Sequence, residues 1–193
     1  YNSWLIKFPT VQHVASSNLK AVLKIWEGLG YYKRAENIHK SSKIIVKNFN
    51  GLIPNNYEML IGLKGIGDYT ASAILSIAYN QQYCAIDGNL KRILSRFFVI
   101  SSKKQTLKNF KNYGVKILSK KRPGECNQAL MDIGREICLP RQPQCTLCPL
   151  NKKCKCAVKK TSTLIQESNK IKKDMLSSIK DVKEVCIVPE TVE

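Results

Sequence analysis

Four cysteines near the end of the chain constrain its folding most strongly. Cys138, Cys145, Cys148 and Cys154 follow the spacing C-x6-C-x2-C-x5-C, so four thiols lie within 17 residues. Outside a secreted protein, such a density of thiols is more typical of metal binding than of disulfides. One C-x2-C pair flanked by single cysteines favours a cubane [4Fe-4S] cluster, whereas zinc ribbons usually pair two C-x2-C knuckles. We therefore predict a cluster that staples this loop.

The other four cysteines lie outside this pattern. We interpret Cys84 and Cys126 as small buried hydrophobic residues, and Cys156 and Cys186 as free thiols without an assigned role.

Apolar residues recur at helical spacing along most of the chain, and no strand pattern occurs before about residue 180. The sequence therefore predicts an all-α fold. Pro123-Gly124 should separate the last two helices. The expected helices follow Asn18, then lie at about 32–49, near 57–61, over 71–78, after 87–89, and at about 104–119 and 125–137.

A tight Gly65-Ile66-Gly67 turn after Lys64 joins two of these helices. Glycine tolerates the φ angles that aim successive backbone N–H groups at one phosphate, so the turn is a candidate DNA contact. An ordinary turn between two helices would have the same sequence, and the turn alone does not separate these two interpretations.

Positive charge is in large excess, with 32 Lys and Arg against 14 Asp and Glu, a formal net charge of +18. Such a domain favours a polyanionic partner, although a lysine-rich genome would also raise the charge. No apolar run is long enough to span a membrane and no signal peptide opens the chain, so we expect a cytoplasmic protein.

Three segments of the chain resemble those of a known family. The order in which the hairpin turn, Asp87 and the cysteine motif follow one another is also typical of that family. Over residues 1–156 the chain resembles the endonuclease III and MutY superfamily of helix-hairpin-helix DNA glycosylases, most closely its MutY branch of adenine DNA glycosylases. The three segments are 26–35 (WEGLGYYKRA), 87–89 (DGN) and 127–134 (NQALMDIG).

The resemblance implies a domain organisation. Residues 1–82 would form a partial six-helix barrel domain with the helix-hairpin-helix, residues 83–156 the iron–sulfur cluster domain, and residues 157–193 a linker and the start of a truncated C-terminal domain. The chain would then be a fragment that lacks an upstream helix bearing the general-acid glutamate, and it would be inactive alone.

The resemblance also assigns roles in catalysis. Asp87 would be the carboxylate beside the sugar, and Asn89 would hold it in place. Tyr69 occupies the position where endonuclease III-like enzymes have a nucleophilic lysine, so strand cleavage through an imine would be absent. A helix N-cap is the alternative interpretation of Asp87.

For DNA binding, the resemblance assigns Lys64, Gly65 and Gly67 to the phosphate contact and Tyr31 to a wedge beside the oxidised guanine. A tyrosine packed in the core is the alternative for Tyr31.

The implied function is monofunctional removal of adenine mispaired with 8-oxoguanine or guanine in duplex DNA. The protein would act as a monomer at the bacterial nucleoid. Two alternatives are a thymine-mismatch or other base glycosylase of this superfamily, and a non-catalytic iron–sulfur module that binds DNA.

Overall fold

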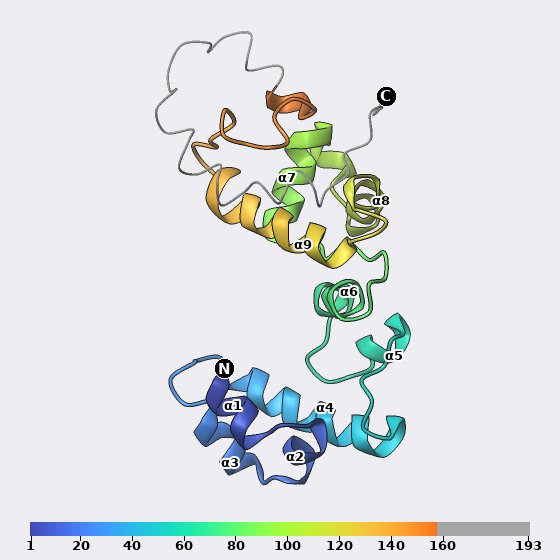
Figure 1. The fold of residues 1–193 in the computed structure, drawn as a ribbon. Helices are drawn as coiled ribbons and strands as arrows, with labels where there is room; N and C mark the ends of the chain where they lie inside the picture. The colour runs from blue at the N-terminus through green and yellow to red at the C-terminus, as the bar shows by residue number, and fades with distance from the viewer. Residues whose placement is uncertain (158–193) are drawn as a thin grey trace. The chain divides into compact units, whose positions relative to one another are not determined.

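A computed structural model describes residues 1–157, and this part of the chain is helical with no strand (Figure 1). The predicted all-α fold is confirmed. The expected linker and C-terminal segment, with Cys186, lie outside the described residues. The elements are α1 Asn2–Lys7, α2 Val11–Ser16, α3 Leu19–Ile25, α4 Tyr32–Phe49, α5 Tyr57–Ile61, α6 Asp68–Ile77, α7 Gly88–Phe98, the 3₁₀ helix η1 Ser102–Lys104, α8 Leu107–Ile117, α9 Pro123–Asp132 and the π-helical η2 Ile133–Ile137.

The chain divides into two compact units, Tyr1–Ala71 and Ser72–Glu193, and the boundary falls within α6. The domain boundary that the sequence suggested lies further along, after residue 82. Within residues 1–157, none of the helices combines the length and the apolar character needed to cross a bilayer.

In the first unit, α2 and α3 pack against the long helix α4. Aromatic rings pack against one another in this unit. Trp4 makes edge-to-face contacts with Phe8 and Trp26, with ring centroids 5.0 Å and 5.6 Å apart. Helices α1 and α2 were not predicted. Each has only six residues and neither has a side-chain cap, so they carry little periodicity or start signal.

Side-chain caps explain why other helices begin where the sequence predicted. Asn18 accepts a hydrogen bond from the Ala21 N–H at 2.8 Å, and Asn56 accepts one from the Met59 N–H at 3.0 Å. Each bond satisfies an N–H group that the first helical turn leaves without a partner. At its other end α4 stops at Asn50, whose φ of 52° is left-handed, as the Asn-Gly pair predicted.

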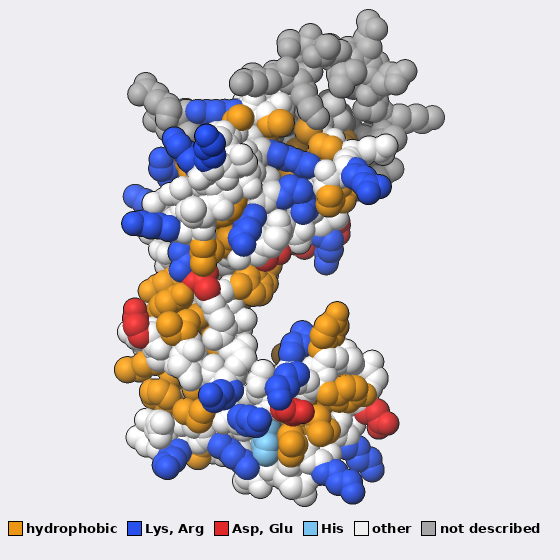
Figure 2. Space-filling model, turned by 180° about the vertical axis from the view of Figure 1, so that it is seen from behind, with side chains coloured by type: hydrophobic (Ala, Val, Ile, Leu, Met, Phe, Trp, Pro, Cys, Tyr) orange, Lys and Arg blue, Asp and Glu red, His pale blue; other side chains and the backbone are white. Residues whose placement is uncertain are grey.

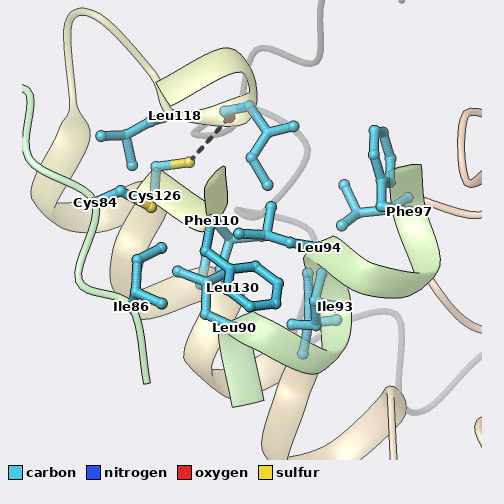
Figure 3. Packing of buried hydrophobic residues seen from close by; sticks show 14 of the residues in the cluster. Cys84, Ile86, Leu90, Ile93, Leu94, Phe97, Phe110, Leu118, Cys126 and Leu130 are labelled. Carbon is cyan, nitrogen blue, oxygen red and sulfur yellow. Dashed lines mark hydrogen bonds between the residues drawn. The ribbon is translucent and has the colours of Figure 1, made fainter. Parts of the chain in front are cut away.

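The core of the second unit lies between α7, α8 and α9 (Figure 3). Leu90 of α7, Phe110 of α8 and Leu130 of α9 are buried together, and Cys84 and Cys126 lie in the same cluster. Burial of these two sulfurs confirms their interpretation as small core residues.

Helix α9 begins earlier than expected, because Pro123 is its first residue and not a separator. Proline suits this position since the first helical N–H has no partner to lose. Gly124 follows, and a Cβ there would lie 2.6 Å from the Ser76 carbonyl oxygen. The close approach of α9 to α6 therefore requires a glycine.

Asn127 of α9 is fully buried and joins three segments of the second unit. Its amide nitrogen donates to Ser76 Oγ and to the Tyr83 carbonyl, both at 2.8 Å, and its Oδ1 accepts from the Ala85 N–H at 3.1 Å. The loop from 78 to 87, which leads to Asp87, is held in place by this side chain.

We predict that Asn127→Ala lowers the free energy of unfolding by about 3 kcal/mol, since it leaves a buried N–H and a buried carbonyl without partners. Urea titration followed by circular dichroism measures the change. The neighbouring Gln128 is exposed, so Gln128→Ala is the matched control and should leave the midpoint almost unchanged. Equal midpoints for the two variants would contradict this role of Asn127.

Candidate functional site

The hairpin turn between α5 and α6 is seated on α4. Gly65 has a φ of +81°, and a Cβ there would lie 2.6 Å from the Asn37 side-chain nitrogen. Ser41, also on α4, donates from Oγ to the Lys64 carbonyl at 2.9 Å. Glycine is therefore required at residue 65 both by backbone angle and by the close approach of α4.

The outer side of this turn is open. A Cβ on Gly67 would meet nothing within 4 Å, and the Lys64 side chain is exposed. Tyr69 lies in the first turn of α6 with 41% of its surface exposed. An extended anion can therefore approach the turn without displacing protein atoms.

Tyr31 stands at the start of α4 in a left-handed backbone conformation, with a φ of 48°. Its side chain is 81% exposed, which excludes the alternative of a core aromatic. The Arg34 guanidinium lies 5.4 Å from the ring centroid, and Trp26 Nε1 fixes the preceding loop by donating to the Gly30 carbonyl at 2.9 Å. A non-glycine residue in this conformation costs of order 1 kcal/mol, and such strain often marks a contact with a ligand.

Asp87 is the N-cap of α7. Its Oδ1 accepts from the Leu90 N–H at 2.7 Å, and the side chain is half-buried. Asp87 is therefore a helix N-cap, as the alternative interpretation had it. It does not exclude chemistry, because the bond uses one oxygen and holds the carboxylate at a helix N-terminus, where negative charge is favoured.

Asn89 has a different partner from the one expected. Its Oδ1 accepts from Arg92 Nη2 at 2.9 Å, and the same nitrogen donates to the Gly134 carbonyl at 2.6 Å. Arg92 Nε donates to the Cys138 carbonyl at 2.7 Å. Arg92 thus links the Asp87-Gly88-Asn89 segment to the first cysteine of the motif.

Arg96, one turn further along α7, binds the same segment. Its Nη1 donates to the Leu139 carbonyl at 2.7 Å and lies 3.2 Å from the Cys138 sulfur, while Nη2 donates to the Pro140 carbonyl at 2.8 Å. Sequence reasoning missed both arginines. Their four-residue spacing on one face of α7 was the available signal.

The four cysteines of the motif line one cavity of about 350 Å³, together with Cys156. Burial raises the pKa of the Cys148 thiol to about 12, and burial also raises the pKa of Cys154. The backbone N–H of Leu150 bonds to the Cys148 sulfur and those of Ala157 and Cys156 to the Cys154 sulfur, which lowers both pKa values in part. A metal would therefore have to displace protons from these thiols.

The cysteines and the cavity that they line fit an iron–sulfur cluster. Four thiols of the motif stand around one cavity of about 350 Å³. A cubane is held by four cysteine thiolates, each bound to a different iron, and tetrahedral zinc can also be held by four thiolates. The cysteine spacing, with one C-x2-C pair, favours the cluster over zinc.

The candidate residues fall into two sets, one in each unit. The first unit holds the candidate DNA contacts and Tyr69. The second unit holds Asp87, Asn89 and the cysteines, which Arg92 and Arg96 bring together.

Comparison with known proteins gives a consistent result. A family model for the HhH-GPD superfamily base excision DNA repair protein matches residues 1–116. The adenine DNA glycosylase of Buchnera aphidicola subsp. Acyrthosiphon pisum (strain APS) is 42% identical over 163 residues, which cover 83% of this chain and 47% of that protein. The human adenine DNA glycosylase is 37% identical over 159 residues, which cover 80% of this chain and 29% of the human protein. The chain spans less than half the length of these relatives.

Solved structures agree on the fold. A thermostable thymine-DNA glycosylase superposes with a TM-score of 0.75 at 23% identity, covering 82% of this chain and 75% of that one. An endonuclease III trapped as a covalent intermediate with DNA has a TM-score of 0.69 at 24% identity, covering 83% and 75%. The resemblance inferred from the sequence motifs is confirmed, and the chain belongs to the HhH-GPD superfamily of base excision DNA repair proteins.

Proposed function

We propose that this protein is a monofunctional DNA glycosylase that removes adenine mispaired with 8-oxoguanine or guanine in duplex DNA. One observation carries the proposal: a half-buried carboxylate, Asp87, is held at the start of a helix that hydrogen bonds anchor to the cysteine loop. The sequence similarity to adenine DNA glycosylases supports the choice of base.

The reaction breaks the bond between C1′ of the deoxyribose and the adenine nitrogen. The electron pair leaves with the base, which takes up a proton, and the hydroxyl of a water molecule ends on C1′. The sugar passes through a state with oxocarbenium character, which a nearby carboxylate stabilises. Asp87 supplies that carboxylate, because its bond to the Leu90 N–H fixes one oxygen and leaves the other for the sugar.

Tyr69 supports the monofunctional assignment, since a tyrosine cannot form the imine through which a lysine cleaves the strand. The product would be an abasic site.

We propose that Lys64, Gly65 and Gly67 hold a backbone phosphate and that exposed Tyr31 fills the space beside the base opposite the adenine. We also propose that the protein is a monomer and that it acts at the nucleoid of a bacterial cell, where its genomic DNA substrate lies.

We also propose that Cys138, Cys145, Cys148 and Cys154 hold a [4Fe-4S] cluster. When bound, the cluster would act as a structural staple for the loop. The residues around it do the positioning: Arg92 and Arg96 fix the carbonyls from 134 to 140, and through α7 they hold Asp87.

Replacement of Asp87 tests the chemistry. Asn caps helices as well as Asp does, so Asp87→Asn keeps the bond to the Leu90 N–H but removes the charge. With this chain placed in the matching segment of the Buchnera aphidicola relative, we expect adenine release from an 8-oxoguanine·adenine duplex to fall by at least about 10²-fold, the scale of one electrostatic contact in a transition state. Duplex binding and the urea midpoint should stay unchanged.

Excision is measured with this chain and with the chain placed in the matching segment of the Buchnera aphidicola relative, because the chain spans less than half of that protein. Thymine·guanine and undamaged duplexes are the substrate controls. Release of thymine without adenine would support the thymine-mismatch alternative. Duplex binding without release of any base, in both forms, would support the non-catalytic module.

Replacement of Arg92 tests whether its hydrogen bonds anchor α7 to the segment from 134 to 138. We predict that Arg92→Gln lowers the unfolding free energy by about 2 kcal/mol, because the carbonyls of 134 and 138 lose a charged donor. It should also lower adenine release without changing the substrate's Km. Arg135→Gln is the control, since Arg135 is 69% exposed and pairs with the surface carboxylates of Asp132 and Glu136. If the two variants behave alike, Arg92 does not anchor Asp87.

A further inference from the structure

Helix α4 carries a row of charged side chains along one face. Lys33, Glu36, Lys40, Lys43 and Lys47 follow alternating spacings of three and four residues. This spacing places side chains one above another on a single side of a helix. The row lies beside the face that packs against the hairpin turn.

Three of the lysines in this row form no salt bridge within the described residues. Lys33 pairs with Glu36 at 2.9 Å, and the charge of Lys40 acts on the same carboxylate from a longer distance. Lys40, Lys43 and Lys47 are all exposed. The sequence has no acidic residue from 37 to 57. Figure 2 shows that lysine and arginine greatly outnumber acidic side chains on the visible face of the molecule.

A groove of about 500 Å³ between α2 and α4 lies next to these charges. Lys43 and Lys47 line one wall, and Gln12, His13 and Ser16 of α2 are part of the lining. Ala15 and Val46 complete the lining, which contains no carboxylate, so nothing in the groove repels an anion bound at the two lysines.

The row is continuous with the candidate DNA contact of the hairpin. Asn37 of α4 lies against Gly65 and Ser41 binds the Lys64 carbonyl, so the turn rests on α4 at residues 37 and 41. Lys40 lies between these two positions in sequence. The three lysines that form no salt bridge therefore begin beside the turn and follow α4 toward its C-terminus.

We propose that Lys40, Lys43 and Lys47 form a second phosphate-binding surface, which holds the DNA backbone beyond the segment that the hairpin holds. The inference rests on the DNA binding of the proposed function but not on its chemistry. At about 1.5 Å per residue these lysines span about 10 Å. One DNA strand carries a phosphate every 3.4 Å or so of helix axis, so the three lysines span about three phosphate intervals.

The composition of the row favours DNA over an acidic protein. Lysine is depleted in protein–protein interfaces, whose strongest contacts come from tryptophan, tyrosine and arginine, and none of these is in the row. Lysine instead acts as a point charge toward phosphate, which gives affinity without reading sequence.

Salt dependence of binding tests the proposal. The variant Lys40→Gln/Lys43→Gln/Lys47→Gln keeps good helix formers at all three sites. We expect the slope of log affinity for a 30-base-pair undamaged duplex against log salt to decrease in magnitude by about 2 to 3, since each phosphate contact contributes about 0.9. The matched control is Lys7→Gln/Lys20→Gln/Lys24→Gln, which removes the same charge from exposed positions of the same unit.

The outcomes separate the two proposals. A reduced slope for the α4 variant, with a smaller change for the control and a shorter hydroxyl-radical footprint on one side, supports the surface. Equal slopes for parent and α4 variant, or equal losses in both variants, overturn it while leaving the glycosylase proposal intact. If the parent chain binds no duplex at all, both proposals fail, whereas failure of adenine release alone affects only the chemistry.

Discussion

The hydrogen bonds from Arg92 and Arg96 to the carbonyls between 134 and 140 are the interactions on which the second unit depends. They satisfy the carbonyl groups that the end of η2 would otherwise leave without partners, and charged donors make such bonds stronger than neutral ones. Through these bonds α7 connects Asp87 with the cysteine loop. Its first turn fixes Asp87, and its second and third turns fix the loop that starts at Cys138.

Local features were predicted well because their causes are local. The bounds of α4 and α5, the cap at Asp87 and the burial of Cys84 and Cys126 follow from apolar spacing and from cap residues. Helices α1 and α2 were missed because six residues show too little periodicity. The links from α7 to the cysteine loop were missed since they join residues more than 40 positions apart, which no window of sequence can pair.

Net charge gave the class of partner but not the place where it binds. Arg92 and Arg96 bind carbonyls within the fold, and Lys33 is paired with Glu36, so none of these cations is available in the way its formal charge suggests. The α4 lysines that form no salt bridge among residues 1–157 are distinguished by their shared face and by the packing of that helix under the hairpin. Separating structural cations from binding cations thus required the structure.

The metal content of the purified chain tests most directly whether the cysteine loop is organised as proposed. Iron, sulfide and zinc are measured together with the thermal midpoint before and after chelation, with Cys148→Ser as the control that removes one ligand. We predict about four iron atoms and four sulfides per chain, with a midpoint that falls when they are removed. One zinc per chain, or a metal-free protein of unchanged stability, would contradict the proposal that an iron–sulfur cluster staples the cysteine loop.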